Sequence, residues 1–308
     1  MVAETGNWGR WGAEDEVGAL NLLTPEVVLQ AVGCVREGRT LSLSLPIRDS
    51  TSSHAPLTVP HLRGRPLPQH FMSVDGGDYA VGARRLKDEI CLADDALVMS
   101  PHGTTTHLDA LSHVWRDDQI YNGHPSGRIR SYGATRCGID KAAAGFVGRG
   151  VLLDVAGHLG VPFLDESVRI DGDLLEACAT GADVEMRRGD IAVVRTGWPT
   201  VFADQPERYQ AGQPGLSYDG GRWLAERDVC MVASDNTGVG AIAADGMFDA
   251  TPEQDLHLLF LWRHGIYLAE MLWLEELAVT GRHEFLFLAA PLVVDGGTGS
   301  AINPLAIL

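Results

Sequence analysis

Residues 150–155, Gly-Val-Leu-Leu-Asp-Val, form an almost continuous apolar run of the kind that predicts a strand covered on both faces. Similar runs follow at 190–196 (DIAVVRT), 229–234 (VCMVAS), 266–271 (IYLAEM) and 285–291 (FLFLAAP). Helix-like segments lie between some of these runs, at 172–180 and 223–226. Strands mixed with helices predict an α/β domain with a mixed β core and flanking helices. No repeat, low-complexity tract or linker interrupts the pattern, so residues 1–308 are expected to form a single domain.

The first third of the chain adds weaker signals. Thr24 followed by Pro25 resembles an N-cap and first helical residue, which predicts a helix to about Arg36. Residues 40–47 (TLSLSLPI) alternate apolar and hydroxyl side chains, as in a half-buried strand, and residues 96–99 also read as a strand. Residues 54–82 are rich in Pro, Gly and His with little periodicity. They are expected to form a long loop that acts as a lid or a wall of a binding cleft.

A capping-box pattern near the C-terminal third predicts a further helix. Thr251-Pro252-Glu253-Gln254 places a hydroxyl three residues before an amide side chain. The helix that begins there is expected to reach Arg263, and Gly265 is expected to end it.

Charge and composition exclude several classes of partner. The 308 residues carry 24 Lys and Arg against 41 Asp and Glu, a net charge of 24 − 41 = −17. Such a surface repels nucleic acid and anionic membranes. The N-terminal sequence does not resemble a signal peptide, and no apolar run approaches the roughly 20 residues of a membrane helix. The five cysteines are scattered without a CxxC pair, which argues against a disulfide framework, so a cytoplasmic protein is expected.

The densest group of potential ligands lies in residues 100–113, SPHGTTTHLDALSH. On an extended segment, His107 and Asp109 point to the same side because side chains alternate with period two, and His113 has the same parity. Imidazole and carboxylate suit a zinc or manganese ion, whereas the absence of thiolates disfavours a structural zinc site. The alternative is a hydroxyl-rich loop whose histidines only hydrogen-bond to backbone.

Glu270 provides a second, independent indication. It lies within the apolar run IYLAEML, where a buried carboxylate is costly unless a cation compensates it. That cation could be a metal ion or an arginine.

The segment 102–113 resembles the pattern His-x-Gly-Thr-His-x-Asp-x-x-x-His of the cyclase family, which includes bacterial kynurenine formamidases and isatin hydrolases. The resemblance extends over nearly the whole chain, through residues 7–21, 117–123, 149–154, 189–198 and 257–270. It implies a swivelling β/β/α fold like that of kynurenine formamidase, and assembly into homo-oligomers.

The resemblance also implies a divalent metal site of one or two ions. Its ligands correspond to His107, Asp109, His257 and Glu270, and His113 corresponds to the family's proton donor and acceptor. The family's first ligand histidine falls on Gly103 here, one residue after His102. A one-residue bulge could bring His102 to the same place.

The activity that this resemblance implies is metal-dependent hydrolysis of an amide or ester bond in a small-molecule substrate, of formamide, cyclic amide or lactone type. A metal-activated water would attack the carbonyl, and His113, with an ordinary pKa of about 6.5, would shuttle the proton. The alternatives are a metal-dependent cyclase or lyase of a biosynthetic pathway, and a metal-poor binding homologue.

Overall fold

The apolar runs form the parallel centre of one large sheet. In the computed structural model, which describes residues 6–48, 59–82, 90–244 and 250–308, they become β7 (Phe146–Asp154), β9 (Ile191–Arg195), β11 (Met231–Ser234) and β12 (Tyr267–Glu270). These strands pair in parallel in the order β7–β9–β11–β12. Every residue of β9, β11 and β12 is buried, as expected for strands covered on both faces. The predicted α/β class is confirmed.

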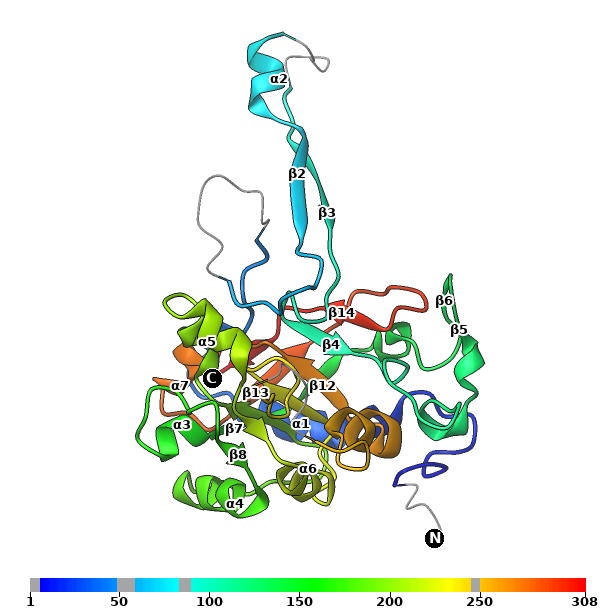
Figure 1. Cartoon of the computed structure of the whole chain (residues 1–308), viewed down its shortest axis with the longest axis vertical. Coiled ribbons are helices and arrows are strands. Elements are labelled where there is room, and N and C mark those ends of the chain that lie inside the picture. Colours follow the sequence, from blue (N-terminus) through cyan, green and yellow to red (C-terminus); the bar gives the residue numbers. More distant parts are fainter. Residues whose placement is uncertain (1–5, 49–58, 83–89, 245–249) are drawn as a thin grey trace.

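Antiparallel strands extend this centre on both sides into a curled, mixed sheet (Figure 1). Beyond β7 lie β13 (Glu284–Ala289), β15 (Leu305–Ile307) and β1 (Thr40–Ser42), and beyond β12 lie β4 (His107–Asp109) and β14 (Gly299–Ala301). Within the described residues the sheet has nine strands. β1 is shorter than the strand predicted at 40–47, because beyond Ser42 only an isolated bridge from Ser44 to Leu272 continues the pairing.

Helices cover the sheet and complete the core. The α-helices are α1 (Pro25–Val32), α2 (Gly76–Ala80), α3 (Val155–His158), α4 (Gly172–Gly181), α5 (Pro206–Ala211), α6 (Tyr218–Ala225) and α7 (Glu275–Ala278). α1 packs on β7 and β13, while α4 packs on β7 and on α6. Thr24 caps α1 by accepting a hydrogen bond from Val27 N, as predicted, but the helix ends at Val32, before Gly33, and not at Arg36. None of the described helices has the length and apolar character needed to cross a bilayer.

The helix predicted from Thr251 starts later than its capping box suggests. Residues 251–254 form a turn in which Gln254 N donates to Thr251 O at 2.9 Å. The Asp255 carboxylate accepts from Leu258 N at 2.8 Å and takes the capping role instead. The π-helix η7 (Leu258–His264) follows and ends at Gly265 in a left-handed conformation, as predicted. The charged acceptor of Asp255 explains the shift, since a carboxylate binds backbone N–H groups more strongly than a hydroxyl does.

A narrow arm projects from the body of the molecule (Figure 1). It consists of β2 (Gln69–Val74) paired with β3 (Asp94–Val98), with α2 near its end. The loop predicted over residues 54–82 is therefore wrong for residues 69–80, while residues 54–58 lie outside the described part of the chain. A lone two-stranded ribbon leaves both faces exposed, so its sequence lacks the alternation that marks a half-buried strand.

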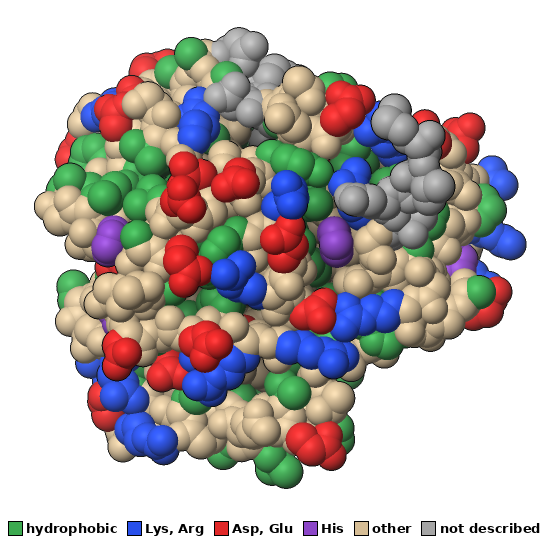
Figure 2. Space-filling model, turned by 90° about the horizontal axis from the view of Figure 1, so that it is seen from below, with side chains coloured by type: hydrophobic (Ala, Val, Ile, Leu, Met, Phe, Trp, Pro, Cys, Tyr) green, Lys and Arg blue, Asp and Glu red, His purple; other side chains and the backbone are tan. Residues whose placement is uncertain are grey.

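The remaining elements are short. Two small sheets pair β8 (Arg169–Ile170) with β10 (Gly215–Leu216), and β5 (Ile129–Arg130) with β6 (Gly133–Ala134). Short 3-10 turns are η1 (Gly18–Leu22), η3 (Tyr121–Gly123), η4 (Ser126–Arg128), η5 (Ile139–Ala142) and η6 (Trp198–Val201). On the face away from the arm, acidic and basic side chains are interspersed, without a large patch of one sign (Figure 2).

Candidate metal centre

The pairing of β4 with β12 places the central motif beside the late glutamate. In this antiparallel pair the register partner of His107 is Glu270, and that of Asp109 is Leu268. Opposite residues of a sheet share a face, and residues two apart on one strand do so as well. His107 Nε2 accordingly lies 3.2 Å from Glu270 Oε2 and 3.6 Å from Asp109 Oδ1. Two segments far apart in the sequence thus meet at one point in the sheet.

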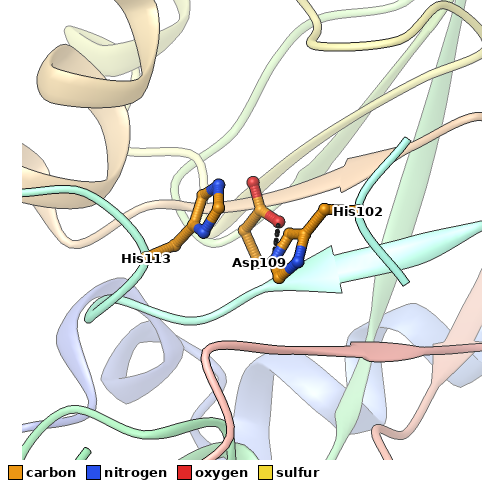
Figure 3. A group of neighbouring side chains, drawn as sticks. All are labelled: His102, Asp109 and His113. Carbon is orange, nitrogen blue, oxygen red and sulfur yellow. Dashed lines mark ion pairs between the residues drawn. The ribbon is translucent and has the colours of Figure 1, made fainter. Parts of the chain in front are cut away.

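The other three histidines singled out in the sequence surround the same point. His102 Nε2 lies 3.3 Å from Asp109 Oδ1, and its ring stacks on that of His113 with centroids 4.1 Å apart (Figure 3). His257, at the start of η7, places Nε2 3.3 Å from Glu270 Oε1 and 3.7 Å from Asp109 Oδ2. All six predicted site residues therefore lie in one cluster.

The turn before β4 brings His102 into the cluster. Thr104 N and Thr105 N both donate to Pro101 O at 3.3 Å, and Gly103 has a φ of 74°. A turn, and not the expected bulge, brings His102 into the cluster. Gly103, at the position of the family's histidine, has a left-handed backbone in this turn. Glycine adopts this conformation without strain. A Cβ at Gly103 would also lie 3.0 Å from Leu62 Cδ1.

Thr106 fixes β4 against its neighbours. Its hydroxyl donates to Met271 O at 2.6 Å and accepts from Leu45 N at 2.9 Å. These bonds connect the residue before His107 with the residue after Glu270, and hold the two strands in register. Thr106 thereby supports the cluster without contacting its carboxylates.

The cluster contains buried acceptors that have no donor. Asp109 is fully buried and Glu270 is 5% exposed. Within the described chain, both Asp109 oxygens, Glu270 Oε1 and His102 Nε2 make no hydrogen bond. His107 Nδ1 lies 2.8 Å from Thr105 O, and because a carbonyl only accepts, Nδ1 carries the proton. In neutral His107 the lone pair of Nε2 then faces a carboxylate oxygen of Glu270.

Such an arrangement is unfavourable unless positive charge lies between the acceptors. A divalent cation would satisfy all of them, and the mixture of imidazole and carboxylate donors suits zinc or manganese. Two overlapping triads have donor atoms close enough for one ion, His107–Asp109–Glu270 and His102–Asp109–His113. The residues present therefore fit a metal centre.

Without a cation, protons supply the positive charge. Burial lowers the pKa of His257, but the close contact with the negatively charged Glu270 carboxylate outweighs burial and raises this pKa to about 9. Burial and the charge of Asp109 raise the pKa of Glu270, yet the close contacts with protonated His107 and His257 outweigh them and bring it down to about 2. Burial raises the pKa of Asp109 too, yet the facing histidines lower it below its ordinary value, so both carboxylates are ionised at neutral pH.

His113 differs from the other histidines. Burial lowers the pKa of its imidazole to about 4, because the nearby charge of Asp109 compensates only part of the lost hydration. The ordinary pKa expected from the sequence is therefore wrong, because burial removes water from around the imidazole. His113 is neutral at neutral pH.

A pocket of about 450 Å³ opens over the cluster. His102, His107, His113, His257 and Glu270 form part of its wall. Apolar side chains from separate loops form much of the remainder: Leu62, Val114, Trp115, Pro252 and Leu258. Leu62 and Arg65 come from the segment that was expected to form a cleft wall. Trp115, Thr237 and Leu258 could not be predicted from the sequence, because no local pattern shows which segments meet over the cluster.

Comparisons with known proteins agree with this architecture. The family model described as "Putative cyclase" matches residues 41–241. A crystal structure described as that of a novel cyclase is 34% identical, with a TM-score of 0.87, and the match covers 98% of this chain and 99% of the other. A comparison with curated protein sequences finds no match.

More distant structures share the fold. An isatin hydrolase bound to the product analogue thioisatinate has a TM-score of 0.64 at 19% identity, and the match covers 93% of this chain and 99% of the other. Isatin hydrolase A from Ralstonia solanacearum has a TM-score of 0.58 at 19% identity, covering 92% and 98%. A predicted metal-dependent hydrolase from Bacillus stearothermophilus has a TM-score of 0.54 at 19% identity, covering 87% and 97%.

Proposed function

This chain belongs to the cyclase family, and we propose that it is a metal-dependent hydrolase of an amide or ester bond, of formamide, cyclic amide or lactone type. The observation that carries the proposal is the set of buried acceptors that face one another around Asp109 and Glu270. Such a set is stable only around a cation or bound protons. A pocket beside it can admit a small substrate.

The chain's own side chains divide into two roles. We propose that His102, His107, Asp109, His257 and Glu270 hold a zinc or manganese ion. A bound ion would supply Lewis acidity for the carbonyl oxygen and a water of lowered pKa. His113 lines the pocket and lies beside Asp109, so it can accept the proton of the attacking water. It would then return that proton to the leaving nitrogen or oxygen.

The first test measures metal content and turnover together. Purified protein is analysed by mass spectrometry for zinc and manganese, and is then assayed with aryl formamides and lactones in ¹⁸O-labelled water. We expect at least one ion per chain and label in the acid product. Ring closure or elimination without label would contradict hydrolysis. Well under one ion per chain, with no activity after zinc or manganese is added, would contradict a metal-dependent enzyme.

The second test separates the proton shuttle from the ligands. His113→Ala is expected to lower turnover by roughly a hundredfold with metal content unchanged, because general acid–base catalysis contributes about 10² to 10⁴. His158→Ala, an exposed histidine on α3 outside the cluster, is the matched control. Loss of metal from the His113 variant would make it a ligand. Full activity and full metal content in Asp109→Ala would refute the assigned site.

Three further expectations concern the whole protein. We propose that the chain acts as a single domain, in the cytoplasm, as a homo-oligomer. Light scattering of the purified protein measures its mass against the 33.1 kDa of one chain.

A further inference from the structure

The loop before the arm is fixed at the pocket from two sides. Leu62 N donates to Gly103 O at 2.7 Å, which joins the loop to the turn that carries His102. On the other side, Gln210 of α5 accepts from Arg63 N at 3.0 Å and donates to His61 O at 2.6 Å. The loop therefore has a defined position at the edge of the metal centre.

Two arginines on this loop have different environments. Arg63 pairs with Glu207 of α5 at 2.6 Å, so its charge is already neutralised. Arg65 lines the pocket over the cluster and also borders the hollow beside α5. Among the described residues, Arg65 has no ion pair and its guanidinium has no hydrogen-bond acceptor. It is also the one Lys or Arg in the described wall of the pocket.

Much of the remaining wall is apolar and partly aromatic, and its other polar side chains include Thr237, Thr251 and Asp255, whose carboxylate accepts from Leu258 N at 2.8 Å. Leu62, Val114 and Leu258 are half-buried, and Trp115 is 49% exposed. A planar apolar body can therefore pack there while one of its ends reaches the cluster. Arg65 lies in the wall of the same pocket, and its planar fork matches the geometry of a carboxylate carried elsewhere on such a body.

We infer that Arg65 is a specificity-determining residue that binds a carboxylate carried by the substrate, remote from the bond that is cleaved. The substrate class is an aromatic or similarly flat apolar acid bearing a hydrolysable amide or ester. The hydrolysable amide or ester in this substrate class rests on the proposed function, whereas the carboxylate rests on Arg65. Because the protein has a net charge of −17, its surface repels anions in general, and an acid gains access only where local positive charge overrides this field.

The test uses two simple probes that differ by one carboxylate. Terephthalate presents carboxylates at both ends of a benzene ring, and benzoate presents one. Binding of each to zinc-treated protein is measured by isothermal titration calorimetry at low ionic strength. Wild-type protein, Arg65→Ala, Arg65→Lys and the control Arg63→Ala are compared, with melting curves to verify that each variant is folded.

We expect wild-type protein to bind terephthalate more tightly than benzoate. Arg65→Ala should weaken terephthalate about tenfold or more and leave benzoate unchanged, as for loss of a charged hydrogen bond. Arg65→Lys should retain part of the preference, and Arg63→Ala should retain all of it. Equal affinity of wild-type protein for the two probes, failure to bind terephthalate, or the same loss for both probes in Arg65→Ala would overturn the inference.

The outcome is independent of turnover. Repeating the titration after chelation shows whether the Arg65 contribution persists when the cluster holds no metal. If terephthalate binds through Arg65 while no formamide or lactone is hydrolysed, the proposed function fails and the anion site stands. If formamides or lactones are hydrolysed but Arg65 substitutions do not change terephthalate binding, the proposed function stands and the Arg65 site fails.

Discussion

Replacing Glu270 by glutamine tests the metal centre with the smallest change of shape. Gln retains the volume of the side chain but removes a charge whose oxygens lie 3.2 Å from His107 Nε2 and 3.3 Å from His257 Nε2. Loss of an outer partner of a metal ligand lowers affinity by about 10 to 100-fold. Glu270 is proposed to be a ligand itself, so the loss of its charge should lower zinc affinity by about 100-fold or more.

The expected stability change follows from that ratio. At a zinc concentration 100 times the wild-type Kd, binding stabilises the folded state by about 2.7 kcal/mol, through RT ln(1 + [L]/Kd). At the same concentration a variant weakened about 100-fold sits at its own Kd and gains only about 0.4 kcal/mol. For a chain of this size, each kcal/mol shifts Tm by about 2 °C. Zinc should therefore raise Tm by about 5 °C in wild-type protein and by about 1 °C in the variant.

The assay compares melting curves with and without zinc at one scan rate, together with calorimetric zinc titration. Each protein without zinc is its own baseline, so destabilisation by the substitution itself cancels. Glu276→Gln makes the same chemical change at an exposed position on α7 and should behave as wild type. An equal zinc shift in wild-type protein and Glu270→Gln would refute the assignment of Glu270 to the centre.

Three other predictions concern the surroundings of the site and the fold. Gly103→Ala should lower the free energy of unfolding by about 1–2 kcal/mol and weaken zinc binding, because the φ of Gly103 is 74° and a Cβ there would press on Leu62. The control Gly38→Ala, at φ 70° in open space, should lower stability without changing the zinc affinity measured by titration. The hydrogen bond from Arg10 lowers the pKa of Asp228 below its ordinary 3.8, so this pair stabilises the fold above that pH and its contribution is lost as the pH falls through the folded value. Asp228→Asn should therefore cost up to about 1 kcal/mol at pH 7 and progressively less below pH 3.8, as urea unfolding at several pH values would show; an equal cost at every pH would contradict the pairing. Chelation of wild-type protein should lower Tm by about 5 °C, and zinc should restore it; a Tm unaffected by chelation of a metal-containing sample would argue against a structural contribution of the ion.

The centre of the fold could be predicted from the sequence because its strands are buried on both faces. β9, β11 and β12 show this directly as apolar runs. The arm could not be predicted, because β2 is exposed over five of its six residues and has no buried side to impose a pattern. The start of η7 was missed since two acceptors, Thr251 and Asp255, compete for the same role and only the packed structure decides between them.

The candidate ligands could be predicted because their chemistry is local. His107 and Asp109 lie two residues apart, and Glu270 is an acid within an apolar strand. Their proximity depends on the pairing of β4 with β12, which no short-range spacing encodes. The pocket wall was mostly missed for the same reason, and the low pKa of His113 depends on burial beside a ring eleven residues away in the chain.

The pairing of β4 with β12 also has a consequence for the order of folding. His107 and Glu270 are 270 − 107 = 163 residues apart, so they meet only after a long stretch of polypeptide has been brought together. Contacts of this range form slowly compared with local structure. A nascent or truncated chain that ends before residue 266 would contain Asp109 and all four histidines of the cluster, yet lack the strand that supplies Glu270. Tight retention of an ion would then report that synthesis had passed Glu270 and that β4 and β12 had paired.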